Sequence, residues 1–362
     1  MKRIYLDYAA TTPVKNEVLM EMLPWFKTVV FDETMYKSAQ KRFAKCLCAD
    51  EGTVHFNSGG SYGNNALLRG LCQATASKGK HVITSTIEHP AVYKVFERLK
   101  NDGYDVDFVK TNEHGVIDLM HFKTLLRTDT AFVSIMWINN ELGTRQPVEK
   151  IVKMCHDNDT RVHVDAVQAL GNLAIDLSIL DVDAMSFSAH KVYAPKGCGA
   201  TYVKSDLKLD APIHNGSCFE SVNMPYIMGF VKGVEIAYEN LEQTNQRKRQ
   251  LKKMLIEGLK DLNLGIRPIG QSREDEQHPG IVNLFIPQMD SDSLIINYNF
   301  QGIAISGGSA CSSGALSASH VLKAIGLSES EARRCVRMTI GDFTTREEIL
   351  SVIDATKAIL KG

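Results

Sequence analysis

The sequence has no long hydrophobic run and almost no excess of charge. No uninterrupted apolar stretch approaches the roughly 20 residues that cross a membrane, and the opening MKRIYLDYAATTP lacks the apolar core of a signal peptide. The formal net charge is −1, so no field favours nucleic acid or an anionic membrane. We therefore expect a cytoplasmic protein that contacts neither a membrane nor nucleic acid directly.

Cysteine pairs and metal-binding clusters are also missing. The chain has 8 cysteines, but a disulfide framework is not expected in 362 residues without a secretory signal. Cys46 and Cys48 have no His or Cys cluster nearby that would complete a zinc site. Most of the cysteines lie in apolar surroundings and are expected to be free, buried thiols. No metal site, internal repeat or low-complexity tract is predicted.

What is present, between about residues 53 and 205, is an alternation of β-branched apolar runs with amphipathic segments. It predicts an α/β fold with a mostly parallel sheet covered by helices on both faces. Past Tyr238 a long charged helix leads to a smaller α+β domain of about residues 245–362. The strands of the first part are predicted at 81–87, 104–111, 131–138, 161–168 and 183–189, and its helices at 90–103, 118–128 and 147–159.

Polar residues lie at the ends of four predicted strands. Ligands bind at the carboxyl ends of strands in open parallel sheets, so these groups are expected at one edge. Each alone has an ordinary structural explanation as a helix cap, loop residue or buried histidine, but four strands together favour a site. The residues are Glu88 and His89, then Asn139, Asn140 and Glu141, then Asp165 and Gln168, then Ser188, His190 and Lys191.

The side chains of this set suit one kind of cofactor. Asp165 lies in an otherwise apolar strand, where a carboxylate is costly unless it meets a cation such as a protonated pyridine nitrogen. His89 is suited to lie flat on an aromatic ring, and Lys191 to form a Schiff base. Gly60 and Ser61, in NSGGSYGNN before a predicted helix, suit a phosphate group. Together these features predict pyridoxal phosphate.

Two residues of the smaller domain extend the site. Cys311 lies among small residues in ISGGSACSSG, either as an ordinary surface thiol or as a carrier that must reach two partners in turn. Arg337, in CVRMTIG, is suited to a bidentate grip on an α-carboxylate.

These motifs resemble the cysteine desulfurase family, in the class V aminotransferase group of fold type I pyridoxal-phosphate enzymes. The resemblance covers almost the whole chain and rests on YLDYAATTPV, TIEHPAV, NNELGTRQPV, HVDAVQ, SAHKVYAPKGCGA, GGSACSSG and VRMTIGDFTT. It implies a large cofactor domain over residues 14–244 with a seven-stranded type of sheet. It also implies a small domain, formed by 1–13 and 245–362, that carries the cysteine loop.

The resemblance also implies roles for single residues. Lys191 would bind the cofactor covalently and move protons, Asp165 would pair with the pyridinium nitrogen, and Cys311 would be the nucleophile that takes sulfur from L-cysteine as a persulfide. The other implied roles are His89 stacked on the ring, Gln168 on the ring hydroxyl, Gly60, Ser61, Ser188 and His190 at the phosphate, Asn140 near substrate and ring oxygen, and Arg337 on the substrate carboxylate. A homodimer that delivers sulfur to an acceptor, for iron–sulfur assembly or tRNA thiolation, is implied too.

The sequence departs from the family pattern in several segments. Residues 28–43 lack the family's Asn-Pro-Ser-Ser-x-His, Ser61 and Tyr62 stand where Thr-Glu is usual, and Trp137 replaces a common histidine. The segment 214–226 is shortened. It lacks the arginines that relatives carry there, and it lacks the threonine that in relatives reaches the partner subunit's cofactor phosphate. Two alternatives stay open: selenocysteine lyase or another class V reaction, and a non-catalytic scaffold that binds a sulfur acceptor.

Overall fold

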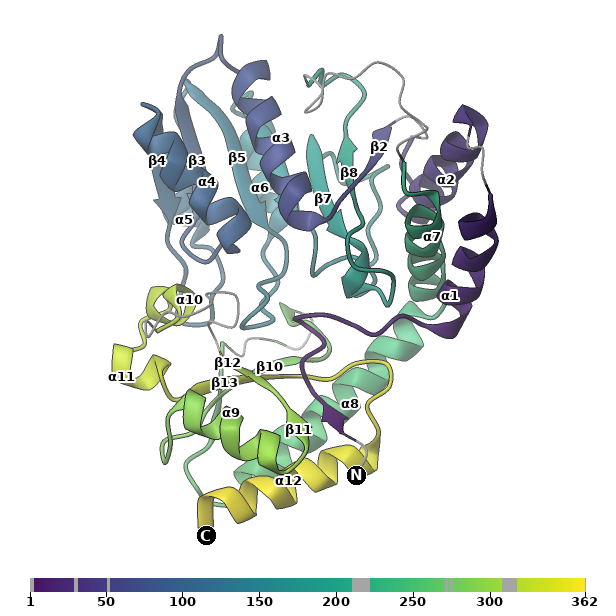
Figure 1. The fold of residues 1–362 in the computed structure, drawn as a ribbon. Coiled ribbons are helices and arrows are strands. Elements are labelled where there is room, and N and C mark those ends of the chain that lie inside the picture. The colour runs from purple at the N-terminus through teal and green to yellow at the C-terminus, as the bar shows by residue number, and fades with distance from the viewer. Residues whose placement is uncertain are drawn as a thin grey trace.

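A computed structural model describes residues 3–28, 32–50, 53–209, 222–270, 273, 276–307 and 318–361 of the chain. Figure 1 shows a large sheet with its helices above a smaller sheet with its own helices, and both chain ends lie beside the smaller sheet. No helix in these ranges combines the length and the apolar character needed to cross a membrane.

The large sheet has seven strands in the order β2-β8-β7-β6-β5-β3-β4. The neighbouring strands β7, β6, β5, β3 and β4 are parallel to one another. β8 pairs antiparallel with β7 and with β2. The predicted mostly parallel sheet is therefore confirmed. Its strands are β2 (Val54–Asn57), β3 (His81–Ser85), β4 (Asp105–Val109), β5 (Thr130–Met136), β6 (Arg161–Asp165), β7 (Ala184–Ser188) and β8 (Gly199–Val203).

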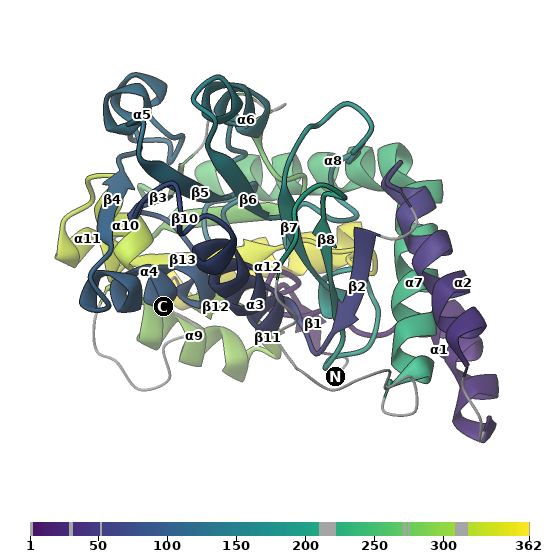
Figure 2. The same ribbon diagram turned by 90° about the horizontal axis from the view of Figure 1, so that it is seen from above.

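Helices cover both faces of this sheet. Seen from above, α5 (Leu119–Leu125) and α6 (Val148–His156) lie on one face, and α3 (Gly60–Ala74) and α4 (Pro90–Asn101) on the other (Figure 2). Beside β2, α7 (Met224–Glu239) packs with α1 (Asn16–Met22) and α2 (Glu33–Cys46), and η1 (Leu23–Lys27) follows α1. Phe43 and Phe230 meet there with ring centroids 5.0 Å apart.

Several strands end earlier than predicted. β3 ends at Ser85, β5 at Met136 and β6 at Asp165, whereas the predicted strands run to 87, 138 and 168. The chain turns at these points, for example where the Ala169 amide donates to the carbonyl of Ala166 at 3.0 Å. The residues after each strand are thus released from the ladder and form the edge of the sheet.

A buried histidine fixes the register of the three central strands. His163 on β6 is hydrogen-bonded to Ser134 of β5 at 2.8 Å and to Ser186 of β7 at 2.9 Å. Burial lowers the pKa of His163 to about 3, so the ring is neutral and each nitrogen is satisfied by a hydroxyl. The register fixed in this way places Asp165 opposite Met136 of β5 and Ser186 of β7.

The second part contains a four-stranded antiparallel sheet in the order β12-β13-β10-β9 and a parallel pair, β1 and β11. These strands are β1 (Ile4–Tyr5), β9 (Arg267–Ile269), β10 (Ile281–Phe285), β11 (Ile303–Ala304), β12 (Ser306–Gly307) and β13 (Cys335–Thr339). The helices are α8 (Leu241–Lys260), α9 (Ser291–Phe300), α10 (His320–Ala324), α11 (Glu329–Ala332) and α12 (Arg346–Lys361).

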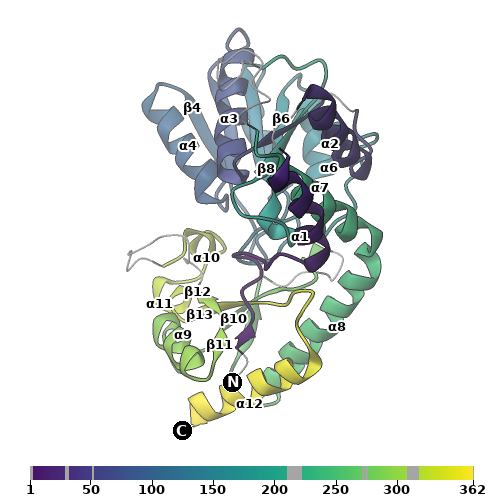
Figure 3. The ribbon, with the colours of Figure 1, turned by 45° about the vertical axis from the view of Figure 1, so that its right-hand side comes forward.

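The N-terminal segment joins the two parts. β1 pairs with β11 in the smaller part, and the chain then runs upward to α1 beside the larger sheet (Figure 3). Leu6 belongs to the hydrophobic core of the smaller part, and Val18 to that of the larger. The division into 14–244 and 1–13 with 245–362 remains a proposal that these two cores support.

Glu88 is a fully buried carboxylate in the turn after β3. Its Oε1 accepts hydrogen bonds from the Ser85 hydroxyl at 2.5 Å and from the Met136 amide at 3.0 Å, while Oε2 has no partner among the described residues. Burial raises the pKa of Glu88 to about 8. The side chain therefore ties β3 to β5 at the carboxyl edge as a protonated acid near neutral pH.

We predict that Glu88 makes stability depend on pH. The folded pKa of about 8 lies above the ordinary 4.5, so between these values the folded chain keeps a proton that the unfolded chain loses. The free energy of unfolding should therefore fall as pH rises through this range, by up to about 1.4 kcal/mol per pH unit from this group. Glu88→Gln should reduce that fall in urea unfolding at pH 5.5 and pH 8.

The matched control is Glu97→Gln, which changes a half-exposed carboxylate on α4. It should keep the pH dependence of the wild type. An identical pH dependence in Glu88→Gln and the wild type would contradict the prediction.

Candidate active site

The polar side chains at the carboxyl edge of the large sheet converge as expected. His89 caps the N-terminus of α4, where its Nδ1 accepts from the Ala91 amide at 3.1 Å. Burial lowers the pKa of His89, and the charges of Asp165 and Lys191 both act on the ring. Residues from the turns after β3, β6 and β7 are therefore close enough to influence one another.

Asp165 is held by two uncharged donors. Its Oδ2 accepts from the Asn64 amide at 2.7 Å, and its Oδ1 accepts from the Val167 backbone at 3.0 Å. Asp165 is only 5% exposed. The two donors orient the carboxylate without neutralising it, which fits a cationic ring nitrogen as its further partner.

Lys191 ends the short η3 turn (Ala189–Lys191) that follows β7. Its Nζ donates to the carbonyl oxygen of Ala10 at 2.8 Å and also to that of Ala9. Helix α7 supports this turn closely, because a Cβ on Gly233 would lie 2.8 Å from the Val192 carbonyl oxygen. The lysine is thus presented on a rigid turn against the N-terminal segment.

The same N-terminal segment contacts two more predicted site residues. Gln168 donates to the Ala9 carbonyl at 3.0 Å. His190 Nδ1 lies 3.1 Å from the Thr11 hydroxyl, and burial lowers the pKa of His190 to about 4. Gln168 and His190 are therefore brought to the same place as Lys191, each with a protein partner.

The predicted phosphate loop lies at the N-terminus of α3. Gly59 precedes the helix with φ of +140°, and its amide donates to the Asn57 side chain at 2.9 Å. A Cβ on Gly60 would lie 2.7 Å from Val167 and 3.3 Å from Ser188. The glycine thus lets the helix start beside the ends of β6 and β7, with its free amides at the site edge. Ser61 is exposed on the first turn.

Arg337 enters from the smaller part of the structure. It lies on β13, is 4% exposed, and donates to the Asn140 carbonyl and to the Asp7 carboxylate, each at 2.8 Å. Its Nε has no partner among the described residues. Asn140, Asp7 and Arg337 therefore meet where the two parts adjoin.

Cys311 lies outside the described residues, as does most of the shortened segment 214–226. Among the departures with described side chains, Trp137 is buried, with the guanidinium carbon of Arg145 6.0 Å from its ring centroid.

Two residues that the fold brings to this site were not predicted from the sequence. Asn64 orients Asp165, and Asp7 pairs with Arg337. Glu141, which was predicted at this sheet edge, contacts Ser319. Asn64 had a usable signal, because it lies one helical turn after Gly60 in the candidate phosphate loop. Asp7 had none, since its partner Arg337 is distant in the chain.

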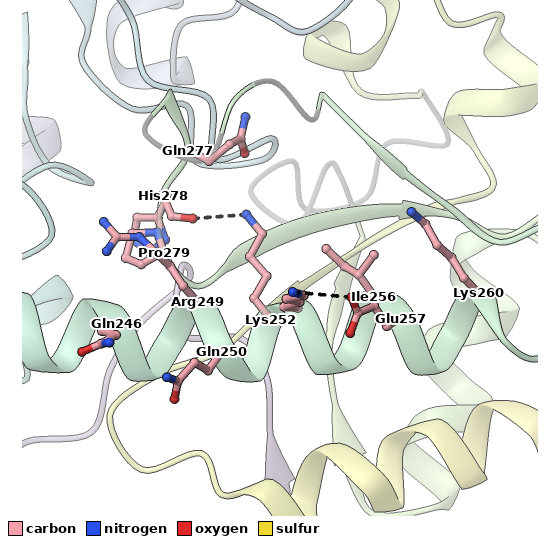
Figure 4. A pocket seen from close by; sticks show the side chains of 11 residues that line it. Gln246, Arg249, Gln250, Lys252, Ile256, Glu257, Lys260, Gln277, His278 and Pro279 are labelled. Carbon is pink, nitrogen blue, oxygen red and sulfur yellow. Dashed lines mark hydrogen bonds and ion pairs between the residues drawn. The ribbon is translucent and has the colours of Figure 1, made fainter.

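A separate cavity of about 550 Å³ lies along α8, away from these residues. Figure 4 shows that it is lined by Arg249, Lys252 and other polar side chains of α8, together with Gln277, His278 and Pro279. None of the predicted site residues with a described position lines it, so cavity size does not mark the candidate active site.

Comparisons with known proteins agree with this geometry. Residues 4–352 match the family model described as aminotransferase class-V. The chain is 34% identical to the cysteine desulfurase IscS of Clostridium botulinum (strain Hall) over 376 residues, covering 99% of this chain and 95% of that protein.

Two solved structures are similar as well. The structure of a NifS-like protein superimposes with a TM-score of 0.91 at 29% identity and covers 99% of both chains. The structure described as SspA in complex with cysteine has a TM-score of 0.79 at 29% identity and covers 94% of this chain and 100% of that one. The chain belongs to the cysteine desulfurase family, within the class V aminotransferases.

Proposed function

We propose that this protein removes sulfur from L-cysteine and carries it as a persulfide on Cys311 to an acceptor protein. The observation that carries the proposal is the meeting of Lys191, Asp165 and His89 at one sheet edge, with Arg337 reaching the adjoining turn from the other part. Family membership supports the reaction class, and the relative solved with cysteine supports the substrate.

The residues fit pyridoxal phosphate. Asp165, oriented by uncharged donors, would hold the pyridinium nitrogen, and Lys191 would hold the aldehyde carbon. His89 would stack on the ring and Gln168 would bond the ring hydroxyl. Gly60, Ser61, Ser188 and His190 would hold the phosphate at the N-terminus of α3. When bound, the cofactor supplies an electron sink that makes the Cα proton of the substrate removable.

The protein side chains would then divide the remaining work. Arg337 would bind the substrate carboxylate, with Asn140 alongside. Lys191 Nζ would take the Cα proton. The Cys311 thiolate would attack the substrate sulfur, so that an S–S bond forms while the Cβ–S bond breaks. The electron pair of that bond stays with Cβ, which gains a proton and becomes the methyl group of alanine.

The acceptor is proposed from the GSACSSG motif, whose family subgroup supplies iron–sulfur assembly and tRNA thiolation. The formal net charge of −1 gives no electrostatic attraction to nucleic acid, so a protein is proposed as the direct acceptor. The proposed compartment is the cytoplasm. Selenocysteine lyase activity remains the alternative within the enzyme class, and a non-catalytic scaffold is the alternative outside it.

Alanine production decides between enzyme and scaffold. We expect the holoenzyme to release alanine from L-cysteine in the presence of a reductant, and Cys311→Ala to lose persulfide and alanine formation while keeping its cofactor. Cys48→Ala, which removes an exposed free thiol, should behave as the wild type. Normal alanine release from Cys311→Ala would refute the nucleophile, and no release from the wild type would favour the scaffold.

Lys191→Ala tests the cofactor assignment. Without this amine no covalent bond to the cofactor forms, so the visible absorbance of the bound cofactor should shift to that of the free aldehyde. Borohydride should then fail to fix the cofactor to the chain. Lys204→Ala, which changes a lysine paired with Asp181, is the control and should leave both readouts unchanged. An unshifted band in Lys191→Ala would contradict the assignment.

The proposed homodimer would use an apolar face of α1 and η1. Leu19, Met20, Leu23 and Phe26 recur at helical spacing and are 46%, 65%, 46% and 58% exposed. We expect sedimentation to give a dimer for the wild type and a monomer for Met20→Asp with Phe26→Asp. Ile179→Asp, at an exposed apolar residue elsewhere, should remain dimeric. A monomeric wild type, or a dimeric double variant, would count against this face.

A further inference from the structure

A turn of the larger part and the start of α10 meet beside Arg337. The turn follows β5 and is built by Asn139, whose Oδ1 accepts from the amides of Glu141 and Leu142 at 2.9 and 2.8 Å. This places Glu141 next to Asn140, whose carbonyl accepts from Arg337. Glu141 is therefore held in a defined position at the substrate end of the site.

Glu141 reaches across to the smaller part. Its Oε2 accepts a hydrogen bond from the Ser319 hydroxyl at 2.6 Å, and both residues are buried. Burial raises the pKa of Glu141 to about 7, while the Ser319 hydrogen bond and the charge of Arg337 oppose that shift. A short hydrogen bond between two buried side chains of different parts is strongly orienting.

Ser319 serves two purposes at once. Besides donating to Glu141, its oxygen caps α10 by accepting from the amides of Val321 and Leu322 at 3.1 and 3.4 Å. The next capping serine, Ser328 of α11, forms an ordinary capping box with Glu331 on the surface. Ser319 and Glu141 thus form a pair that spans the two parts, whereas Ser328 and Glu331 form a pair that does not.

A second link lies one residue further on. His320 Nε2 is 3.0 Å from the backbone oxygen of Glu88, directly before His89. The ring of His320 also lies against Tyr93 of α4, with centroids 5.0 Å apart. The start of α10 is therefore attached at two points to the turns that carry candidate site residues.

Ser319 and His320, which form these links, lie close to Cys311 in the sequence. Ser319 follows Cys311 by eight residues. On the other side of Cys311, β12 pairs with β13 so that Ser306 lies opposite Arg337. Both described flanks of the cysteine segment are therefore anchored beside the residue proposed to bind the substrate carboxylate.

We propose that Glu141 is a positioning residue for sulfur transfer, because through Ser319 it fixes where the chain leaves the cysteine segment relative to Arg337. This inference rests on the proposed function. It concerns the step at which the Cys311 thiolate bonds to the substrate sulfur and the Cβ–S bond breaks. It predicts no effect on the earlier binding of cysteine to the cofactor.

The test separates these two steps in a single turnover of the holoenzyme. Stopped-flow absorbance follows the first spectral change after cysteine is added, and quenched samples give the persulfide on Cys311 by mass. Ser319→Ala and Glu141→Ala should each slow persulfide formation about tenfold, which is the scale of a lost hydrogen bond to a charged group. The first spectral change should stay within about twofold of the wild type.

Three further variants make the result specific. Ser319→Ala combined with Glu141→Ala should be no slower than either single change, because both remove one interaction. Glu141→Gln keeps an acceptor oxygen and should recover most of the rate. Ser328→Ala removes the matched surface cap and should transfer sulfur at the wild-type rate.

Equal slowing of both steps, additive effects in the double variant, or wild-type persulfide rates in Ser319→Ala would overturn the role of Glu141. Absence of persulfide in the wild type would overturn the proposed function itself, so the two failures are distinguishable.

Discussion

The ion pair between Arg337 and Asp7 holds the N-terminal segment along which the two parts of this protein share a site. Asp7 directly follows Leu6, which is anchored in the smaller core, and the chain then passes Lys191 on its way to α1. The carbonyls of Ala9 and Ala10 accept from Lys191 and Gln168 along this path. One extended segment therefore contacts both Arg337, proposed to bind the substrate carboxylate, and Lys191, proposed to bind the cofactor.

Burial of polar groups has a cost that this structure meets with hydrogen bonds across the carboxyl edge of the sheet. Glu88 is bonded to Ser85 and Met136, and Glu141 to Ser319. In each case the shifted pKa follows from burial. These side chains stabilise the turns that hold neighbouring residues of the candidate site. The desolvation cost of burying them therefore falls on residues beside that site. Such concentration of strained or buried polar groups is typical of functional sites.

The departures from the family pattern with described side chains include one at the proposed phosphate end of the site and one in the interior. Ser61 is exposed at the first turn of α3, and Trp137 packs in the interior. Lys191, Asp165, His89 and Arg337 remain, and the fold aligns with a NifS-like structure over 99% of the chain. The chain thus keeps the residues to which the family resemblance assigns the chemistry. It differs from the family at Ser61, in the loop proposed to bind the cofactor phosphate.

The sequence alone determined the strand–helix alternation, the parallel sheet and the edge at which Asp165 and Lys191 lie. These follow from local periodicity and from the rule that strand ends of a parallel sheet meet. Only the tertiary structure decided the pairs Asp165–Asn64, Asp7–Arg337 and Glu141–Ser319, which join residues 101, 330 and 178 positions apart. It also ended β3, β5 and β6 early, because the turns after them form side-chain and backbone bonds that compete with the ladder. Contacts of this kind depend on how separate elements pack, and no local pattern encodes that packing.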